Sequence, residues 1–113
     1  MRWVALGLVI LAVVAAAVII VAMRSASAEA HEIIDHGGVL LDVRSPEEFA
    51  AGHLPGAMNI PVGEVRARAA ELGPRSRPVV TYCRSGGRSA RAAATLRELG
   101  FERVLNLGPK AAW

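Results

Sequence analysis

The sequence has 113 residues, of which 53% are hydrophobic, and it carries a formal net charge of +3 with a single cysteine. This length limits the chain to one small globular domain, and one cysteine excludes an intramolecular disulfide. From residue 29 onward there are 11 basic and 10 acidic residues, a net charge of +1, so there is no charge excess for a phosphate backbone and nucleic acid is excluded as an expected partner.

The N-terminal segment is almost entirely apolar. Residues 3–23 contain no charged side chain, and Arg2 and Arg24 flank them. A helix of this length extends over about 31 Å, which matches the hydrocarbon core of a bilayer. We therefore predict a single-pass transmembrane anchor over residues 1–24. We expect it to contact the membrane through residues 3–23 and to hold the domain on the extracytoplasmic (periplasmic) side.

A cleaved signal peptide is the alternative interpretation of this segment. Ala26-Ser27-Ala28 fits the small-residue pattern that precedes a cleavage site. The uncharged stretch, however, is longer than the hydrophobic region of a signal peptide, which has about 7–15 residues. The length favours an uncleaved anchor, followed by a linker over residues 25–29 and a globular domain over residues 30–113.

The first half of the domain alternates between helix and strand patterns. Residues 29–35 predict a short helix that ends at a glycine pair. Residues 39–43 form a nearly continuous apolar run, which is typical of a strand covered on both faces. Residues 45–48 then combine an N-cap serine, a proline at the first helical position and a capping-box glutamate, so a helix is predicted over residues 47–51.

The second half continues the alternation. The pattern predicts a short strand over residues 57–60, a helix over 62–72, a strand over 78–82, a helix over 89–99 and a last strand over 104–107. This order favours an α/β fold with a central parallel sheet and helices on both faces. In such folds ligands bind beyond the carboxyl ends of the strands.

The only cysteine lies in a six-residue loop, Cys83-Arg84-Ser85-Gly86-Gly87-Arg88, between the strand pattern and the helix pattern. Backbone N–H groups and the positive end of the helix dipole converge there and favour a thiolate. The glycines let amides turn toward the sulfur, whereas a buried structural cysteine needs none of these features. We predict that Cys83 is a nucleophile and that Arg88 holds an anionic substrate. Arg84 is either a substrate ligand or a solvated side chain.

The three histidines do not form a second site with this cysteine. His31, His36 and His53 all precede the loop by at least thirty residues, and their spacing matches no zinc site. We therefore expect neither a metal nor a cofactor. His53 lies in a predicted turn, where its expected role is to stabilise the turn.

Several segments together resemble the rhodanese-like domain family. They are Leu41-Asp42-Val43-Arg44, the run from Ser45 to Phe49, the run from Gly52 to Pro61, the cysteine loop, and Asn106-Leu107-Gly108 with Trp113. These segments occur in the order of the family and span nearly all of the predicted domain. The resemblance implies a three-layer α/β sulfurtransferase fold around a parallel sheet.

The resemblance also implies a reaction and a set of site residues. Cys83 would take a sulfane sulfur from a donor such as thiosulfate, form a persulfide, and pass the sulfur to a thiol or to cyanide. Arg88 would face the sulfonate of the donor, and Asp42, Arg44 and His53 would be structural supports. The substrate-binding loop implied by the family comprises Arg84, Ser85, Gly86, Gly87, Arg88 and Ser89.

Two other functions are compatible with the same loop. Cysteine-dependent phosphatases and some arsenate reductases use a C-x5-R loop, whereas here the arginine follows after four residues and position 89 is serine. A shorter loop suits a sulfur atom better than a tetrahedral phosphate. A non-enzymatic rhodanese-like module that binds a partner or senses redox state is the second alternative. We expect the domain to be a monomer.

Overall fold

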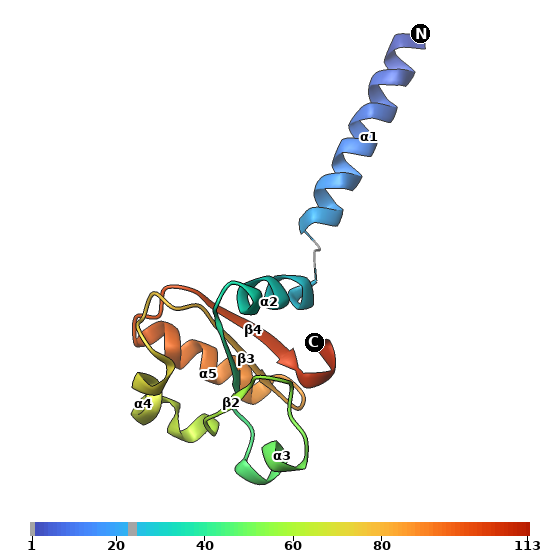
Figure 1. Cartoon of the computed structure of the whole chain (residues 1–113). Helices are drawn as coiled ribbons and strands as arrows, with labels where there is room; N and C mark the ends of the chain where they lie inside the picture. The colour runs from blue at the N-terminus through green and yellow to red at the C-terminus, as the bar shows by residue number, and fades with distance from the viewer. Residues whose placement is uncertain (1, 23–24) are drawn as a thin grey trace.

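The computed structural model describes residues 2–22 and 25–113. Its N-terminal helix, α1 (Arg2–Ala22), stands apart from an α/β domain (Figure 1). The domain contains four further helices, α2 (Ala26–Asp35), α3 (Pro46–Ala51), α4 (Val65–Arg68) and α5 (Gly87–Glu98). Three short 3₁₀ segments cover Val62–Glu64, Ala69–Leu72 and Lys110–Ala112.

The sheet has four strands, β1 (Val39–Asp42), β2 (Met58–Asn59), β3 (Val79–Cys83) and β4 (Val104–Pro109). Their spatial order is β2-β1-β3-β4, and every neighbouring pair is parallel. The carboxyl ends of all four strands therefore lie at one edge of the sheet. The predicted α/β fold with a central parallel sheet is confirmed.

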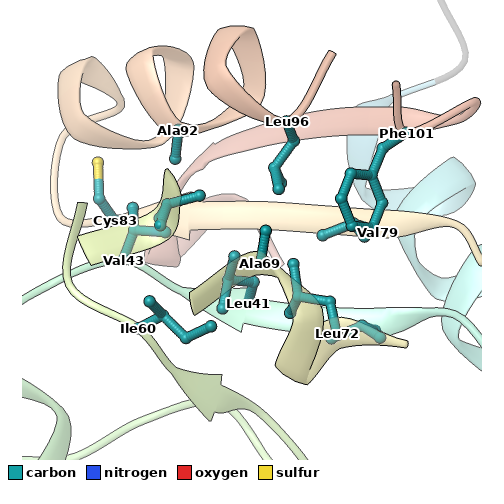
Figure 2. Packing of buried hydrophobic residues seen from close by; sticks show 12 residues of the cluster. Leu41, Val43, Ile60, Ala69, Leu72, Val79, Cys83, Ala92, Leu96 and Phe101 are labelled. Carbon is teal, nitrogen blue, oxygen red and sulfur yellow. The ribbon is translucent and has the colours of Figure 1, made fainter. Parts of the chain in front are cut away.

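Two apolar clusters cover the two faces of the sheet. On one face, Val65, Leu72 and Leu96 from α4, the following 3₁₀ segment and α5 pack with strand residues and with Cys83 (Figure 2). On the other face, Ala30 and Ile33 of α2 pack with residues of β1, β3 and β4. Helices thus lie on both faces, as predicted, and the sulfur of Cys83 lies at the border of the first cluster.

Several predicted boundaries differ from the structure by one or two residues, and two elements differ by more. Helix α2 begins at Ala26 instead of residue 29, so most of the predicted linker over residues 25–29 is helical. The reason is local, because the Ser25 side chain accepts a hydrogen bond from the Ala28 amide, 3.3 Å away, and caps the helix. The predicted helix over residues 62–72 is only one α-helical turn between two 3₁₀ segments.

Helix α1 has the length and apolar composition needed to cross a bilayer, and the side chains of residues 2–19 are exposed. A signal sequence near an N-terminus has the same properties. Met23 and Arg24, which end the predicted anchor, lie outside the described residues. The structure therefore supports an apolar helix at this position.

Candidate functional site

Cys83 is the last residue of β3 and lies at the carboxyl edge of the sheet, fully buried. Its sulfur atom points toward the first turn of α5 (Figure 2). The predicted strand ended one residue earlier, at Tyr82, so the thiol is held by the sheet itself rather than by a loop. This position combines a rigid support with a helix N-terminus, as the sequence predicted.

Backbone and hydroxyl groups surround the sulfur. The Gly86 amide donates a hydrogen bond to Sγ over 3.0 Å. The Ser89 hydroxyl lies 3.5 Å from Sγ and accepts the S–H of the thiol form, while its own proton goes to the Gly86 carbonyl over 2.9 Å. When the thiol ionises, the Ser89 hydroxyl can turn and donate to the sulfur.

This environment favours the thiolate. Burial raises the pKa of Cys83, but the Ser89 hydroxyl and the amides of Ser89, Gly86 and Ser85 lower it by more, so the pKa lies below its usual value. The groups that lower the pKa of Cys83 are all neutral, and no histidine is among them. The hydrogen bonds thus favour the thiolate form of Cys83.

Gly86 is required by the shape of the loop. Its φ of 109° lies in the left-handed region, which side chains other than glycine rarely adopt. A Cβ at this position would also touch the end of β4, 3.7 Å from Gly108 Cα and Pro109 Cδ. The glycine therefore lets its own amide turn toward Sγ while the loop packs against β4.

Arg88 forms a two-point ion pair with Glu48 of α3. Its Nη1 and Nη2 donate to Oε1 and Oε2 over 2.6 and 3.0 Å. Glu48 Oε1 also accepts from the Ser45 amide over 3.2 Å, which completes the predicted capping box. Arg88 is predicted to face the donor; in the structure both ends of its guanidinium group donate to Glu48 and tie α5 to α3.

The pair predicts an acidic titration of Glu48. Its hydrogen bonds from Arg88 and from the Ser45 amide lower the pKa to about 2, so the pair should persist until the pH falls to that range. A carboxyl carbon NMR titration should place the Glu48 midpoint near pH 2, and the Arg88→Gln variant should raise it. A wild-type midpoint in the usual glutamate range would show that the pair does not form in solution.

Asp42 and Arg44 form a buried ion pair where β1 ends. Arg44 Nε donates to both Asp42 oxygens over 3.0 and 3.1 Å, and Nη2 donates to Oδ2 over 2.7 Å. These hydrogen bonds raise the pKa of the Arg44 guanidinium, although its burial lowers it. Asn59 donates to the carbonyls of both residues. The pair joins β1 to the start of the following loop.

The turn after α3 is held from two sides. His53 Nδ1 lies 2.9 Å from the Phe49 carbonyl, and the two rings stack 3.7 Å apart. The Tyr82 hydroxyl accepts from the Leu54 amide over 3.0 Å, and burial raises the pKa of Tyr82 to about 12, so its phenol stays neutral. His53 thus occupies the turn-stabilising position that the sequence suggested, while Tyr82 and Asn59 were missed.

A hollow of about 290 Å³ lies beside the cysteine loop. Arg84 is exposed, as is Ser85. A larger hollow of about 420 Å³ between α4 and the end of α5 contains none of the predicted site residues. Among the residues described, no group of three or more His, Cys, Asp or Glu side chains is arranged to hold a metal ion. The hollow beside the loop is lined by Arg44, Glu48, Ala51, Gly52, Arg84 and Lys110.

Known proteins share this fold and this sequence pattern. The "Sulfurtransferase" of Allochromatium vinosum is 46% identical over 76 residues, which cover 66% of this chain and 70% of that protein. The "Thiosulfate sulfurtransferase PspE" of Escherichia coli is 41% identical over 69 residues, which cover 60% and 66%. Sulfur transfer is thus the activity named for these relatives.

A solved structure and a family model agree with these relatives. The structure titled "rhodanese with anions from E. coli" superposes with a TM-score of 0.65 at 35% identity and covers 68% of this chain and 92% of its own. The model of the "Rhodanese-like domain" matches residues 26–108. This range includes the whole cysteine loop and all four strands except the last residue of β4. The chain therefore belongs to the rhodanese-like domain family.

Proposed function

We propose that this chain is a sulfurtransferase that carries sulfane sulfur as a persulfide on Cys83. The donor is thiosulfate or a similar anion, and the acceptor is a thiol or cyanide. The observation that carries the proposal is the set of neutral hydrogen-bonding groups around Sγ, the Gly86 amide and the Ser89 hydroxyl, which lowers the pKa of Cys83. Relatives that are named sulfurtransferases support it.

In the first half-reaction the Cys83 thiolate attacks the sulfane sulfur of thiosulfate. A new S–S bond forms, the S–S bond of thiosulfate breaks, and sulfite leaves with the electron pair. The negative charge moves to the outer sulfur of the persulfide, where the loop amides can stabilise it, and the amide of Gly86 already donates to the sulfur of Cys83. The charge balances without an external oxidant.

In the second half-reaction the acceptor attacks the outer sulfur. Cyanide becomes thiocyanate, and the Cys83 thiolate leaves as the same group that began the cycle. The chain has no second cysteine that could resolve the persulfide, so the sulfur must go to an external nucleophile. The cysteine loop therefore acts twice, first on the attacking thiolate and then on the departing one.

The burial of the sulfur bears on the alternatives. Redox-sensing cysteines are accessible to solvent, whereas Cys83 has no exposed surface. The exposed Arg84 and Ser85 follow Cys83 directly and connect the buried sulfur to the surface. A loop one residue shorter than the C-x5-R phosphatase loop also favours sulfur over phosphate.

We further propose that residues 1–24 are retained as a single-pass anchor and that the domain over residues 30–113 lies on the extracytoplasmic side as a monomer. The support is the length and composition of α1. A C-terminal tag on the full chain in membrane vesicles of known sidedness tests this. Membrane-bound tag that protease removes from the outside agrees with the proposal, and soluble or protected tag contradicts it.

Intact-mass measurement tests the persulfide. The full chain in detergent is incubated with thiosulfate, desalted and weighed. We expect a gain of one sulfur atom that cyanide removes, and no gain in the Cys83→Ser variant. Absence of the gain in the wild-type chain, or its presence in the variant, contradicts the proposed function.

A further inference from the structure

Two cations line one hollow next to the cysteine loop. Cys83 and Pro109 are paired in the register of the neighbouring parallel strands β3 and β4. Arg84 follows the first of them and Lys110 follows the second, so the two cations leave adjacent strands at the same carboxyl edge. Both line the hollow of about 290 Å³, which places positive charge where ligands of parallel sheets bind.

The other charged residues of this hollow already have partners of opposite charge. Arg44 is paired with the buried Asp42, and Glu48 is paired with Arg88. Within residues 2–22 and 25–113, neither Arg84 nor Lys110 lies within ion-pair distance of a carboxylate. The unbalanced charge of the hollow therefore comes from these two side chains.

Lys110 is held in place by the turn opposite. Its Nζ donates to the Gly52 carbonyl over 3.1 Å, and the same carbonyl accepts from Arg44 Nη2 over 2.7 Å. An ammonium group has three N–H donors, so two remain for a ligand. Lys110 and Arg84 carry like charges at one hollow, and an anion bound between them would reduce their repulsion.

We propose that Lys110, together with Arg84, binds the anionic end of the sulfur donor and determines the preference for anionic donors. This inference rests on the proposed function. For thiosulfate, the sulfonate would lie in the hollow while the sulfane sulfur enters the cysteine loop. Arg88, which the family resemblance suggested for this contact, is paired with Glu48 of α3 in this structure. Lys110 is the only lysine in the sequence.

A test that is independent of sulfur chemistry uses two alkylating reagents of similar size. Iodoacetate is anionic and iodoacetamide is neutral. In both reactions the Cys83 thiolate forms a C–S bond as the C–I bond breaks and iodide leaves. In the full chain, Lys110→Gln should lower the ratio of the iodoacetate rate to the iodoacetamide rate roughly 3- to 10-fold, and Lys110→Arg should restore it.

Arg103→Gln is the matched control. This substitution also removes one positive charge, but Arg103 precedes β4 at the opposite edge of the sheet, where it pairs with Glu29. Its rate ratio should equal that of the wild type. An unchanged ratio in Lys110→Gln, or an equal fall in Arg103→Gln, overturns the inference. The iodoacetamide rate checks in each variant that the loop is folded.

The same variants are then loaded with thiosulfate. Lys110→Gln should raise the KM for persulfide formation about tenfold and change the maximal rate much less, because the lost contact binds the donor rather than the sulfur being transferred. An unchanged KM overturns the inference while the proposed function stands. If thiosulfate loads neither the wild type nor any variant, but the alkylation ratio of Lys110→Gln falls as expected, the anion site stands and the proposed function fails.

Discussion

Replacing Asp42 by alanine is expected to lower the free energy of unfolding by about 3–5 kcal/mol. Asp42 is fully buried, and it accepts three hydrogen bonds from the side chain of Arg44 and one from its amide. Without the carboxylate, the guanidinium stays buried with no countercharge at the end of β1. Urea unfolding of the full chain in detergent, followed by tryptophan fluorescence, measures the change.

Two further variants separate the stranded charge from other effects. Asp35→Ala removes an exposed carboxylate and should change the free energy by no more than about 0.5 kcal/mol. Asp42→Ala combined with Arg44→Met removes both charges and should recover part of the loss. A change below about 1 kcal/mol in Asp42→Ala, or no recovery in the double variant, would contradict the assigned role of the pair.

Replacing Ser89 by alanine is expected to slow persulfide formation about tenfold near neutral pH. The Ser89 hydroxyl is the strongest of the hydrogen-bonding groups that lower the pKa of Cys83. Without it the pKa rises, so a smaller fraction of the sulfur is thiolate at any pH below the new value. Above both pKa values the sulfur is fully ionised in both proteins, and the two rates should converge.

The pH dependence distinguishes this effect from loss of folding. Rates of Cys83 alkylation by iodoacetamide, measured over a pH series, should show the midpoint of Ser89→Ala shifted upward. Ser85→Ala is the control, because Ser85 acts on the sulfur through its backbone amide and should keep the wild-type midpoint. The same midpoint in Ser89→Ala and in the wild type would show that the Ser89 hydroxyl does not lower the pKa of Cys83.

The parts of the site that sequence could predict are those set by short stretches of chain. The strand, the glycine loop and the helix start around Cys83 are contiguous, so the activated thiol follows from local rules. The capping box of Ser45 and Glu48 is likewise local, and its prediction is confirmed. The alternation of helices and strands predicted the parallel sheet, because helices and strands have different hydrophobic periods.

The contacts that sequence could not predict join distant segments. Arg88 and Glu48 are 40 residues apart, Lys110 and the Gly52 carbonyl 58 apart, and Tyr82 and the Leu54 amide 28 apart. No local pattern selects Glu48 over the neighbouring Glu47 as the partner of Arg88. The register of β3 and β4 is what brings Lys110 next to Arg84, and register depends on packing of the whole sheet.

The most direct test of a Cys83 persulfide as the working intermediate is a single turnover. The full chain is loaded with thiosulfate, freed of excess donor, and mixed with cyanide while thiocyanate and intact mass are followed together. We expect thiocyanate in an amount equal to the persulfide loaded, formed as the added sulfur leaves Cys83. Thiocyanate without loss of mass, or loaded protein that yields none, would contradict it.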